Sequence, residues 1–370
     1  MSAGIAARLR GLLALLALLS LSWLTGCSGP PPEIHRSFLA LGTLVEVTLR
    51  EVPEDRAAAL LDAVEATFQR RHREWHAWQE SPLTRLNRAF AEGRCLPVPE
   101  VLAPLFAPAT RLAVASGHRF NPAIGRLIAL WGFHEEPYPD HPPPEAEIRA
   151  LVQAKPRMTD LYRDAGGRLC SRNRAVALDF GGFAKGWIVG EVVRELRQAG
   201  VAHAVVDAGG DLQVLGRHGD RRWRIGIRDP QRKGAVLAAL ELDSGESVFT
   251  SGDYERFFVW HGRRYHHILD PRTGYPATGA RSVTVIHPDP AVADAAATAL
   301  FVAGAGHWPA VAARMGVTQV LLVAPDGRLE ASPAMARRLR LADPERSLHV
   351  RVETSPAPAV SDSGETSDER

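Results

Sequence analysis

Three glycine-rich segments in the second half of the chain combine an accessible backbone with side chains that can do chemistry. They are residues 179–186 (DFGGFAKG), 207–211 (DAGGD) and 266–274 (HHILDPRTG). Paired glycines let backbone N–H groups come close to a ligand. Asp, His and Thr side chains can hold a hard metal ion and move protons. Together the three segments indicate an enzyme that binds a phosphorylated cofactor.

A fourth segment offers oxygen ligands for a metal. Asp294 and Thr298 are four residues apart in an Ala-rich helix expected over residues 294–303, so they share one helix face. A carboxylate and a hydroxyl suit Mg²⁺, which keeps waters or phosphate oxygens in its other positions. A surface Asp beside a Thr bonded to its own helix would show the same spacing.

Each glycine segment also has a purely structural explanation. Lys185 would begin a helix over residues 185–199, after a strand ending near Leu178, and a helix N-terminus with a lysine is a ready phosphate site. The same residues could form only a tight turn with a solvated lysine. Gly209 and Gly210 could likewise do no more than close a hairpin.

The adjacent histidines and a nearby polar segment remain equally open. His266 and His267 would point to opposite faces of a strand, so one of them can face a site. Residues 250–254 (TSGDY) place a hydroxyl, a glycine and a carboxylate in what we expect to be a turn.

The order of expected elements defines the fold class. Helices are expected over residues 54–78, 101–116 (with a kink or a later start because of Pro104 and Pro108) and 145–153. Short strands are expected at residues 41–49, 204–206, 212–215, 224–227, 236–242, 257–260, 264–268, 282–286 and 318–324. Clustered strands with few crossover helices predict an α+β fold, with mixed and mostly antiparallel sheets flanked by helices.

The composition of the chain limits its possible size of core, partners and cysteine chemistry. The chain has 370 residues, 45% of them apolar, which is enough for a large core in a single catalytic unit. The formal net charge of +2 gives no sign of a nucleic-acid partner. Cys95 and Cys170 could pair in an oxidising compartment or stay as buried thiols.

The N-terminus has the pattern of a lipoprotein signal peptide over residues 1–26. Arg8 and Arg10 precede an apolar run at residues 11–21, and residues 24–27 (LTGC) resemble the bacterial lipobox. We therefore expect lipidation of Cys27 and a periplasm-facing place in the bacterial cell envelope, with an ordinary signal peptide as the alternative.

The remaining boundaries follow from composition. A Pro-rich tether is expected over residues 27–36, a catalytic domain over 37–350 and a disordered tail over 351–370. Without residues 1–26 the chain keeps 42 basic and 42 acidic residues, so attachment to the membrane would depend on lipid rather than on charge.

Eight segments, in order, resemble the ApbE family of FAD:protein FMN transferases, within a matching stretch from about Leu41 to Gly304. They are residues 41–43 (LGT), 81–87 (SPLTRLN), 120–125 (FNPAIG) with 130–133 (LWGF), 179–186, 207–211, 251–254, 267–274 and 294–298. Such an ordered set is far more specific than any one of its members.

The resemblance implies a fold related to the T-fold and a definite chemistry. FAD would be the substrate and Mg²⁺ the metal, and the FMN half would pass to a threonine or serine hydroxyl of an acceptor protein of a membrane redox complex, with release of AMP. The metal ligands would be Asp294, Thr298 and the carbonyl of Ala184. His267 would be the catalytic residue, with Asp270 beside it.

The resemblance also implies which residues contact FAD. They are Leu41, Gly42, Thr43, Asn87, Asp179, Gly181, Gly182, Lys185, Gly209, Gly210, Asp211, Ser251, Gly252, Asp253, His267 and Thr273.

Two positions depart from the family pattern. Leu41 stands where Met is usual, a change that conserves volume, and Asn121 stands where Asp is usual, so we assign it no acid or base role. Two other functions remain open: an FAD pyrophosphatase that passes FMN to water, and a non-catalytic lipoprotein that carries flavin. The Asp294/Thr298 pair and His267 argue against the carrier, which needs no metal at a phosphoanhydride.

Overall fold

The computed structural model describes residues 33–134 and 137–352. The expected lipidation site, Cys27, and residues 353–370 of the expected tail lie outside these residues. Within them, no helix has both the length and the apolar character needed to cross a membrane.

A nine-stranded sheet forms the centre of the molecule, and all neighbouring strands are antiparallel except β14 and β16. Its strands, in spatial order, are β1 (Glu33–Ala40), β2 (Thr43–Arg50), β5 (His203–Ala208), β6 (Leu212–Leu215), β9 (Ser247–Gly252), β12 (Ser282–His287), β13 (Gln319–Val323), β14 (Leu329–Ala331) and β16 (Leu348–Val350). The predicted α+β class with mostly antiparallel sheets is confirmed.

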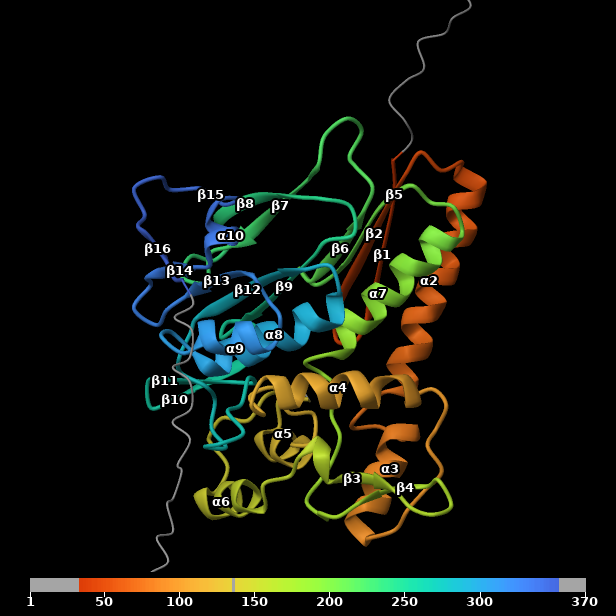
Figure 1. Ribbon diagram of the computed structural model, residues 1–370, viewed down its shortest axis with the longest axis vertical. Helices are drawn as coiled ribbons and strands as arrows, with labels where there is room; N and C mark the ends of the chain where they lie inside the picture. Colours follow the sequence, from red (N-terminus) through yellow and green to blue (C-terminus); the bar gives the residue numbers. More distant parts are fainter. Residues whose placement is uncertain (1–32, 135–136, 353–370) are drawn as a thin grey trace, which may run out of the picture.

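Helices cover one face of this sheet (Figure 1). They are α2 (Glu54–Glu74), α7 (Ala184–Gln198), α8 (Pro290–Ala303) and α9 (Trp308–Arg314). In α2 the buried residues include Ala57, Leu61, Val64 and Phe68, the face expected from helical spacing. Helix α8 is buried along almost its whole length, and its small alanines let it lie close to β9 and β12.

Helices α7 and α8 cross in direct backbone contact. A Cβ atom at Gly186 would lie only 2.2 Å from the carbonyl oxygen of Pro290, so no residue larger than glycine fits at this crossing. The first turn of α7 is thereby fixed against the first turn of α8.

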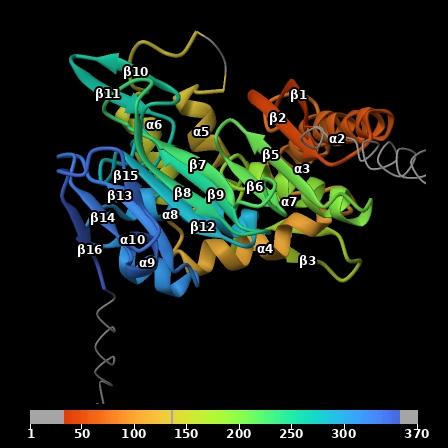
Figure 2. The same ribbon diagram turned by 90° about the horizontal axis from the view of Figure 1, so that it is seen from above.

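A small sheet covers the other face (Figure 2). Its strands are β15 (Arg340–Leu341), β8 (Val236–Leu242) and β7 (Trp223–Arg228), and α10 (Pro333–Ala336) packs nearby. Leu240, Val248 and Leu321 belong to a second apolar cluster between the layers.

The rest of the chain forms a mainly helical region below the sheet in Figure 1, with a projecting ribbon. Its elements are α3 (Pro82–Glu92), α4 (Ala103–Ala115), α5 (Gly125–Trp131), α6 (Glu145–Ala154), a 3₁₀ turn (Met158–Asp160), β3 (Leu161–Arg163), β4 (Leu169–Ser171), β10 (Phe257–Trp260) and β11 (Arg263–His266). Helix α4 does start late, which places Pro104 in its first turn and Pro108 inside it.

An aromatic cluster joins this region to the β10–β11 ribbon. Trp131 stacks near Phe133, Phe258 and Tyr265, and its indole Nε1 donates a hydrogen bond to the carbonyl of Gly274 at 2.8 Å. The ribbon and the segment that follows it are therefore tied to α5.

Three expectations about local structure are wrong. Residues 33–36, assigned to the tether, form the first half of β1 and pair with residues 47–50 of β2. The segment before Asp179 is no strand, because it makes only one bridge, between Ile124 and Ala177.

The third error concerns Thr250 and Ser251, which lie in strand β9 rather than in a turn. Their polar side chains hid a buried central strand: the hydroxyl of Thr250 lies 2.9 Å from that of Thr284 on β12, and Ser247 donates to the carbonyl of His287. Hydroxyl groups that form hydrogen bonds between neighbouring strands can lie inside a sheet. This segment therefore lacks the alternation of apolar and polar residues by which a strand is predicted from the sequence.

Cys95 and Cys170 form a disulfide, which closes a loop between residues 75 positions apart. This decides the alternative that the sequence left open.

Replacing both cysteines by serine should lower the free energy of unfolding by about 2–4 kcal/mol, because the unfolded chain regains the entropy of a long loop. Urea unfolding followed by circular dichroism measures this change. Reducing the wild-type protein should give the same loss, and reductant should not affect the double variant. A wild-type urea midpoint that does not respond to reductant would contradict the expectation.

Candidate active site

The site is built where the loop before α7 meets α8. Asp294 is buried, and its Oδ2 accepts a hydrogen bond from the backbone N of Gly186 at 2.9 Å. A Cβ atom at Gly182 would lie 3.2 Å from Thr298 Oγ1. Asp294 and Thr298 therefore both face the DFGGFAKG loop, as their spacing of four residues predicted.

Strand β9 contributes the next wall of the site. Ser251 Oγ lies 3.3 Å from Thr298 Oγ1. The backbone N of Thr250 donates to Oδ1 of Asp211 at 2.7 Å, and the other carboxylate oxygen of Asp211 forms an ion pair with Lys185. Three of the glycine-rich or polar segments thus converge on one place.

The charges of this cluster depend on one another. Burial raises the pKa of Asp294 to about 7, and the nearby Lys185 limits that rise. Burial acts to lower the pKa of Lys185, but the charges of Asp211 and Asp294 hold it above its ordinary value. Two carboxylates, those of Asp211 and Asp294, thus share the ammonium of Lys185.

The donor atoms at this point fit a hard divalent cation. Asp294 supplies a carboxylate and Thr298 a hydroxyl, and the buried Ala184, the first residue of α7, lies in sequence between Gly182 and Gly186, which contact them. The only three His, Cys or carboxylate ligands that converge within the described ranges are Cys95, Asp164 and Cys170, and the disulfide occupies both sulfurs. Oxygen ligands at α8 are therefore the better candidate for a metal.

The DAGGD segment is a hairpin turn between β5 and β6. Gly209 and Gly210 have φ values of +76° and +92°, and Asp207 Oδ1 accepts from the backbone N of Gly210 at 2.6 Å. A Cβ atom at Gly209 would lie 2.1 Å from Thr43 Oγ1, so this turn lies directly against the start of β2. Burial raises the pKa of Asp207 to about 6.

Next to this hairpin lies the turn between β1 and β2. It consists of Leu41 and Gly42, with φ values of +53° and +71°. A leucine with a left-handed backbone conformation is strained, and residues with such strain are often found at ligand sites.

Asn87 has a positioning role. Its Nδ2 donates to the carbonyl of Leu178 at 2.9 Å, and its Oδ1 accepts from the backbone N of Leu178 at 2.6 Å. Both polar ends of the amide are thus engaged by the segment that leads into Asp179. Asn87 holds that segment in place, and its contact with FAD stays a prediction.

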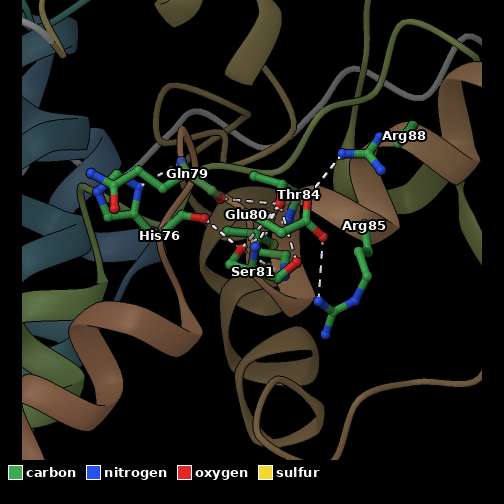
Figure 3. A network of polar contacts seen from close by, with 8 residues as sticks. His76, Gln79, Glu80, Ser81, Thr84, Arg85 and Arg88 are labelled. Atoms are coloured by element: carbon green, nitrogen blue, oxygen red, sulfur yellow. Dashed lines mark hydrogen bonds and ion pairs between the residues drawn. The ribbon is translucent and has the colours of Figure 1, made fainter.

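Helix α3, which carries Asn87, begins with a capping box (Figure 3). The hydroxyl of Ser81 accepts from the backbone N of Thr84, Thr84 Oγ1 accepts from the backbone N of Ser81, and Ser81 Oγ donates to the carbonyl of His76 at 2.6 Å. Glu80 adds ion pairs to Arg85 and Arg88. The SPLTRLN segment therefore acts by fixing the start of this helix.

Asp179 supports its own loop. Its Oδ1 accepts from the backbone N of Gly181 at 2.6 Å, and its backbone N donates to the carbonyl of Pro122. Burial raises its pKa, while the charge of Arg256 acts in the opposite direction.

The two adjacent histidines have different surroundings. His266 is buried and donates from Nε2 to the carbonyl of Ala277 at 2.7 Å, and burial lowers its pKa to about 4, which marks it as structural. His267 is half-buried and donates from Nδ1 to the carbonyl of Arg256 at 3.3 Å. This bond leaves Nε2 of His267 as a proton acceptor.

The pKa of His267 lies well below its ordinary value, first because of burial and then because of the charge of Arg256. A neutral imidazole at physiological pH can take a proton from a hydroxyl. Arg256 itself was missed by sequence reasoning. It interacts electrostatically with Asp179, Lys185 and His267, and its only sequence signal is its place just after residues 250–254.

Several predicted site residues are engaged elsewhere. Both carboxylate oxygens of Asp270 accept from the guanidinium of Arg272, at 2.9 and 2.8 Å. Thr273 is exposed and accepts from the backbone N of Tyr275. The structure places these two residues in the turn after His267 and gives neither a contact with the Asp294 cluster.

The end of β9 is similar. Asp253 forms ion pairs with Arg264 and Arg281, at 3.3 and 3.5 Å. A Cβ atom at Gly252 would lie 2.4 Å from the ring of Tyr254, so the glycine makes room for that ring.

The chain is similar to known proteins of one family. The model of the ApbE family matches residues 41–322. The chain belongs to the ApbE family.

Two curated relatives bear the name FAD:protein FMN transferase. One, from Rhodobacter capsulatus, is 43% identical over 312 residues, which are 84% of this chain and 59% of the relative. The other, from Treponema pallidum, is 35% identical over 329 residues, which are 84% of this chain and 90% of the relative. This chain thus spans little more than half of the first relative and most of the second.

Solved structures of the family have the same fold. The ApbE protein of Thermotoga maritima superposes with a TM-score of 0.75 at 32% identity, covering 84% of this chain and all of that one. The apo flavinyl transferase ApbE of Pseudomonas stutzeri gives a TM-score of 0.73 at 30% identity, covering 85% and 98%.

Asp207→Asn should make the stability of the protein less dependent on pH. The folded pKa of Asp207 is about 6 against an ordinary 3.8, so its contribution is fully present below pH 3.8 and is lost as the pH rises through 6. Asn keeps the acceptor for Gly210 and cannot ionise. In urea titrations at pH 4.5 and 7, the wild type should lose about 1–2 kcal/mol more than the variant. Equal losses would show that Asp207 is not the titrating group.

Proposed function

We propose that this flavin transferase of the ApbE family takes FAD as its substrate and Mg²⁺ as its metal. It transfers the FMN half to a threonine or serine hydroxyl of an acceptor protein and releases AMP. The observation that carries the proposal is the buried Asp294 beside Thr298 and the glycine loop, where burial raises the pKa of its carboxyl group to about 7. The names of the relatives, FAD:protein FMN transferase, support the choice of donor and acceptor.

The residues that would hold Mg²⁺ are Asp294, Thr298 and the carbonyl of Ala184. When bound, Mg²⁺ neutralises charge on the two phosphates of the pyrophosphate. Asp294 must lose its proton to serve as a ligand, and because burial raises its pKa to about 7, this deprotonation is favoured only above neutral pH.

The chain itself supplies placement and proton transfer. Backbone N–H groups of Gly181 and Gly182, with Lys185, would stabilise charge that develops on the phosphates. The acceptor hydroxyl attacks the phosphorus of the FMN half while the bond from that phosphorus to the oxygen of AMP breaks. Nε2 of His267 takes the proton of the hydroxyl, and AMP leaves with its own bridging oxygen.

The acceptor and the location rest on the sequence. An acceptor in a membrane redox complex agrees with an enzyme held at the periplasmic face of the membrane through lipidated Cys27. A lipid anchor would confine the enzyme to the surface where such complexes lie.

Mass spectrometry of an acceptor domain, incubated with this protein, FAD and Mg²⁺, tests the transfer. We expect a gain of one FMN moiety on a hydroxyl residue, lost with EDTA or in Asp294→Ala. AMP and free FMN without a mass gain on any acceptor would indicate a pyrophosphatase. No AMP under any condition would indicate a flavin carrier.

His267→Ala should keep FAD bound and lose transfer by about 10²-fold or more, because a general base is removed while the metal ligands stay. FAD binding is followed by flavin fluorescence, and transfer by the mass gain. His266→Asn serves as a neighbouring control that changes the buried structural histidine. Full transfer by His267→Ala would reject the role of His267.

A further inference from the structure

A second cavity lies apart from the Asp294 cluster. Its volume is about 330 Å³, and it lies among α5, α6, the loop before α5 and the turn after His267. One part of its wall is apolar and includes Ile124, Leu127 and Val152. None of the residues proposed to bind FAD or the metal lines it.

The charged residues of this cavity are all basic. Arg126, Lys155, Arg157 and Arg272 line it, and no Asp or Glu does. The guanidinium of Arg272 is paired with Asp270 behind the wall, and Arg126 donates to a backbone carbonyl. An excess of positive charge beside an apolar wall attracts an anion that also has an apolar part.

Two polar atoms at this place are buried without a hydrogen-bond partner among the described residues. They are Nδ1 of His118, which lines the cavity, and Nε of the adjacent Arg119. The pKa of Arg119 is lowered by burial and then by the charges of Arg272 and Arg314. Asp270 offsets part of the repulsion between these cations, and a bound anion would offset more of it.

The backbone is also strained here. Among the described residues only five non-glycine residues have positive φ, and two of them, His118 at +61° and Lys155 at +48°, line this cavity. Strain of this kind persists where the surroundings hold a residue for binding or catalysis.

We propose that this cavity binds a nucleoside monophosphate, with its phosphate at the basic rim and its base against the apolar wall. The volume lies at the lower end of small-molecule pockets, as a single nucleotide requires. This inference rests on the proposed function in one respect: AMP is a product of the proposed reaction. Because Arg272 is paired with Asp270 in the turn after His267, a phosphate drawn to Arg272 couples the cavity to that turn.

Calorimetric titration of the full chain with AMP, in the absence of metal, tests the site. AMP should bind with one-to-one stoichiometry. Lys155→Gln and Arg126→Gln should each weaken AMP binding by about ten-fold or more, because each removes a charge-assisted contact. Arg224→Gln, an exposed arginine on β7, is the matched control and should leave the affinity unchanged. Circular dichroism confirms that each variant is folded.

Adenosine and inorganic phosphate are titrated separately. Both should bind more weakly than AMP. Adenosine equal to AMP would overturn the role of the basic rim, and phosphate equal to AMP would overturn the nucleoside assignment.

Asp294→Ala separates this inference from the proposed function. The variant should keep its affinity for AMP although it loses the proposed metal ligand. Loss of AMP binding in Asp294→Ala, or no effect of Lys155→Gln and Arg126→Gln, would place AMP at the metal site and overturn the proposal. An enzyme without transfer activity that still binds AMP through Lys155 and Arg126 would refute the proposed function alone.

Discussion

The contact between α7 and α8 is the constraint on which the rest of the site depends. Gly186 lets the two helices touch backbone to backbone at Pro290, and the same glycine donates its N–H to Asp294. A side chain at this position would separate the helices and withdraw the carboxylate from the DFGGFAKG loop. The small alanines of α8 also let this helix pack closely against the sheet. The helix therefore places the carboxylate of Asp294 in the protein interior, with the hydroxyl of Thr298 one turn further along.

Burial at this crossing gives the cluster its chemistry. Carboxylates in a low-dielectric interior resist ionisation unless cations compensate them. Lys185 compensates Asp211, and Asp294, which shares that cation, has its pKa raised to about 7 by burial. The pKa of His267 is shifted in the opposite direction: burial, helped by the charges of Arg256 and Lys185, lowers it and keeps the imidazole neutral. The same buried cluster therefore contains a candidate ligand for a cation, Asp294, and a candidate proton acceptor, His267.

Much of the fold could be predicted from the sequence, because the patterns were local. The buried face of α2, the alternation in β2 and the strands β6, β8 and β10 follow directly from apolar periodicity. The start of β1 was hidden in a proline-rich segment, and β9 was hidden because its buried hydroxyls bond across the sheet.

The site was predicted in part for the same reason. The i, i+4 relation of Asp294 and Thr298 is local and was confirmed as one face. The partner of Lys185, the engagement of Asn87 with Leu178 and the place of Arg256 arise from contacts between distant segments, and no spacing in the sequence encodes them. Asp270 is paired with Arg272, only two residues along the chain, whereas Asp253 is paired with Arg264 and Arg281, which lie farther along the chain.

The bond from Trp131 to the carbonyl of Gly274 gives the protein a built-in optical probe. The fluorescence of an indole depends on the polarity and hydrogen bonding around it, and this indole is buried in an aromatic cluster with its N–H committed to the turn that follows His267. Any displacement of that turn must stretch or break this bond. One of the chain's eight tryptophans thus senses the turn that follows the proposed proton acceptor, without an added label.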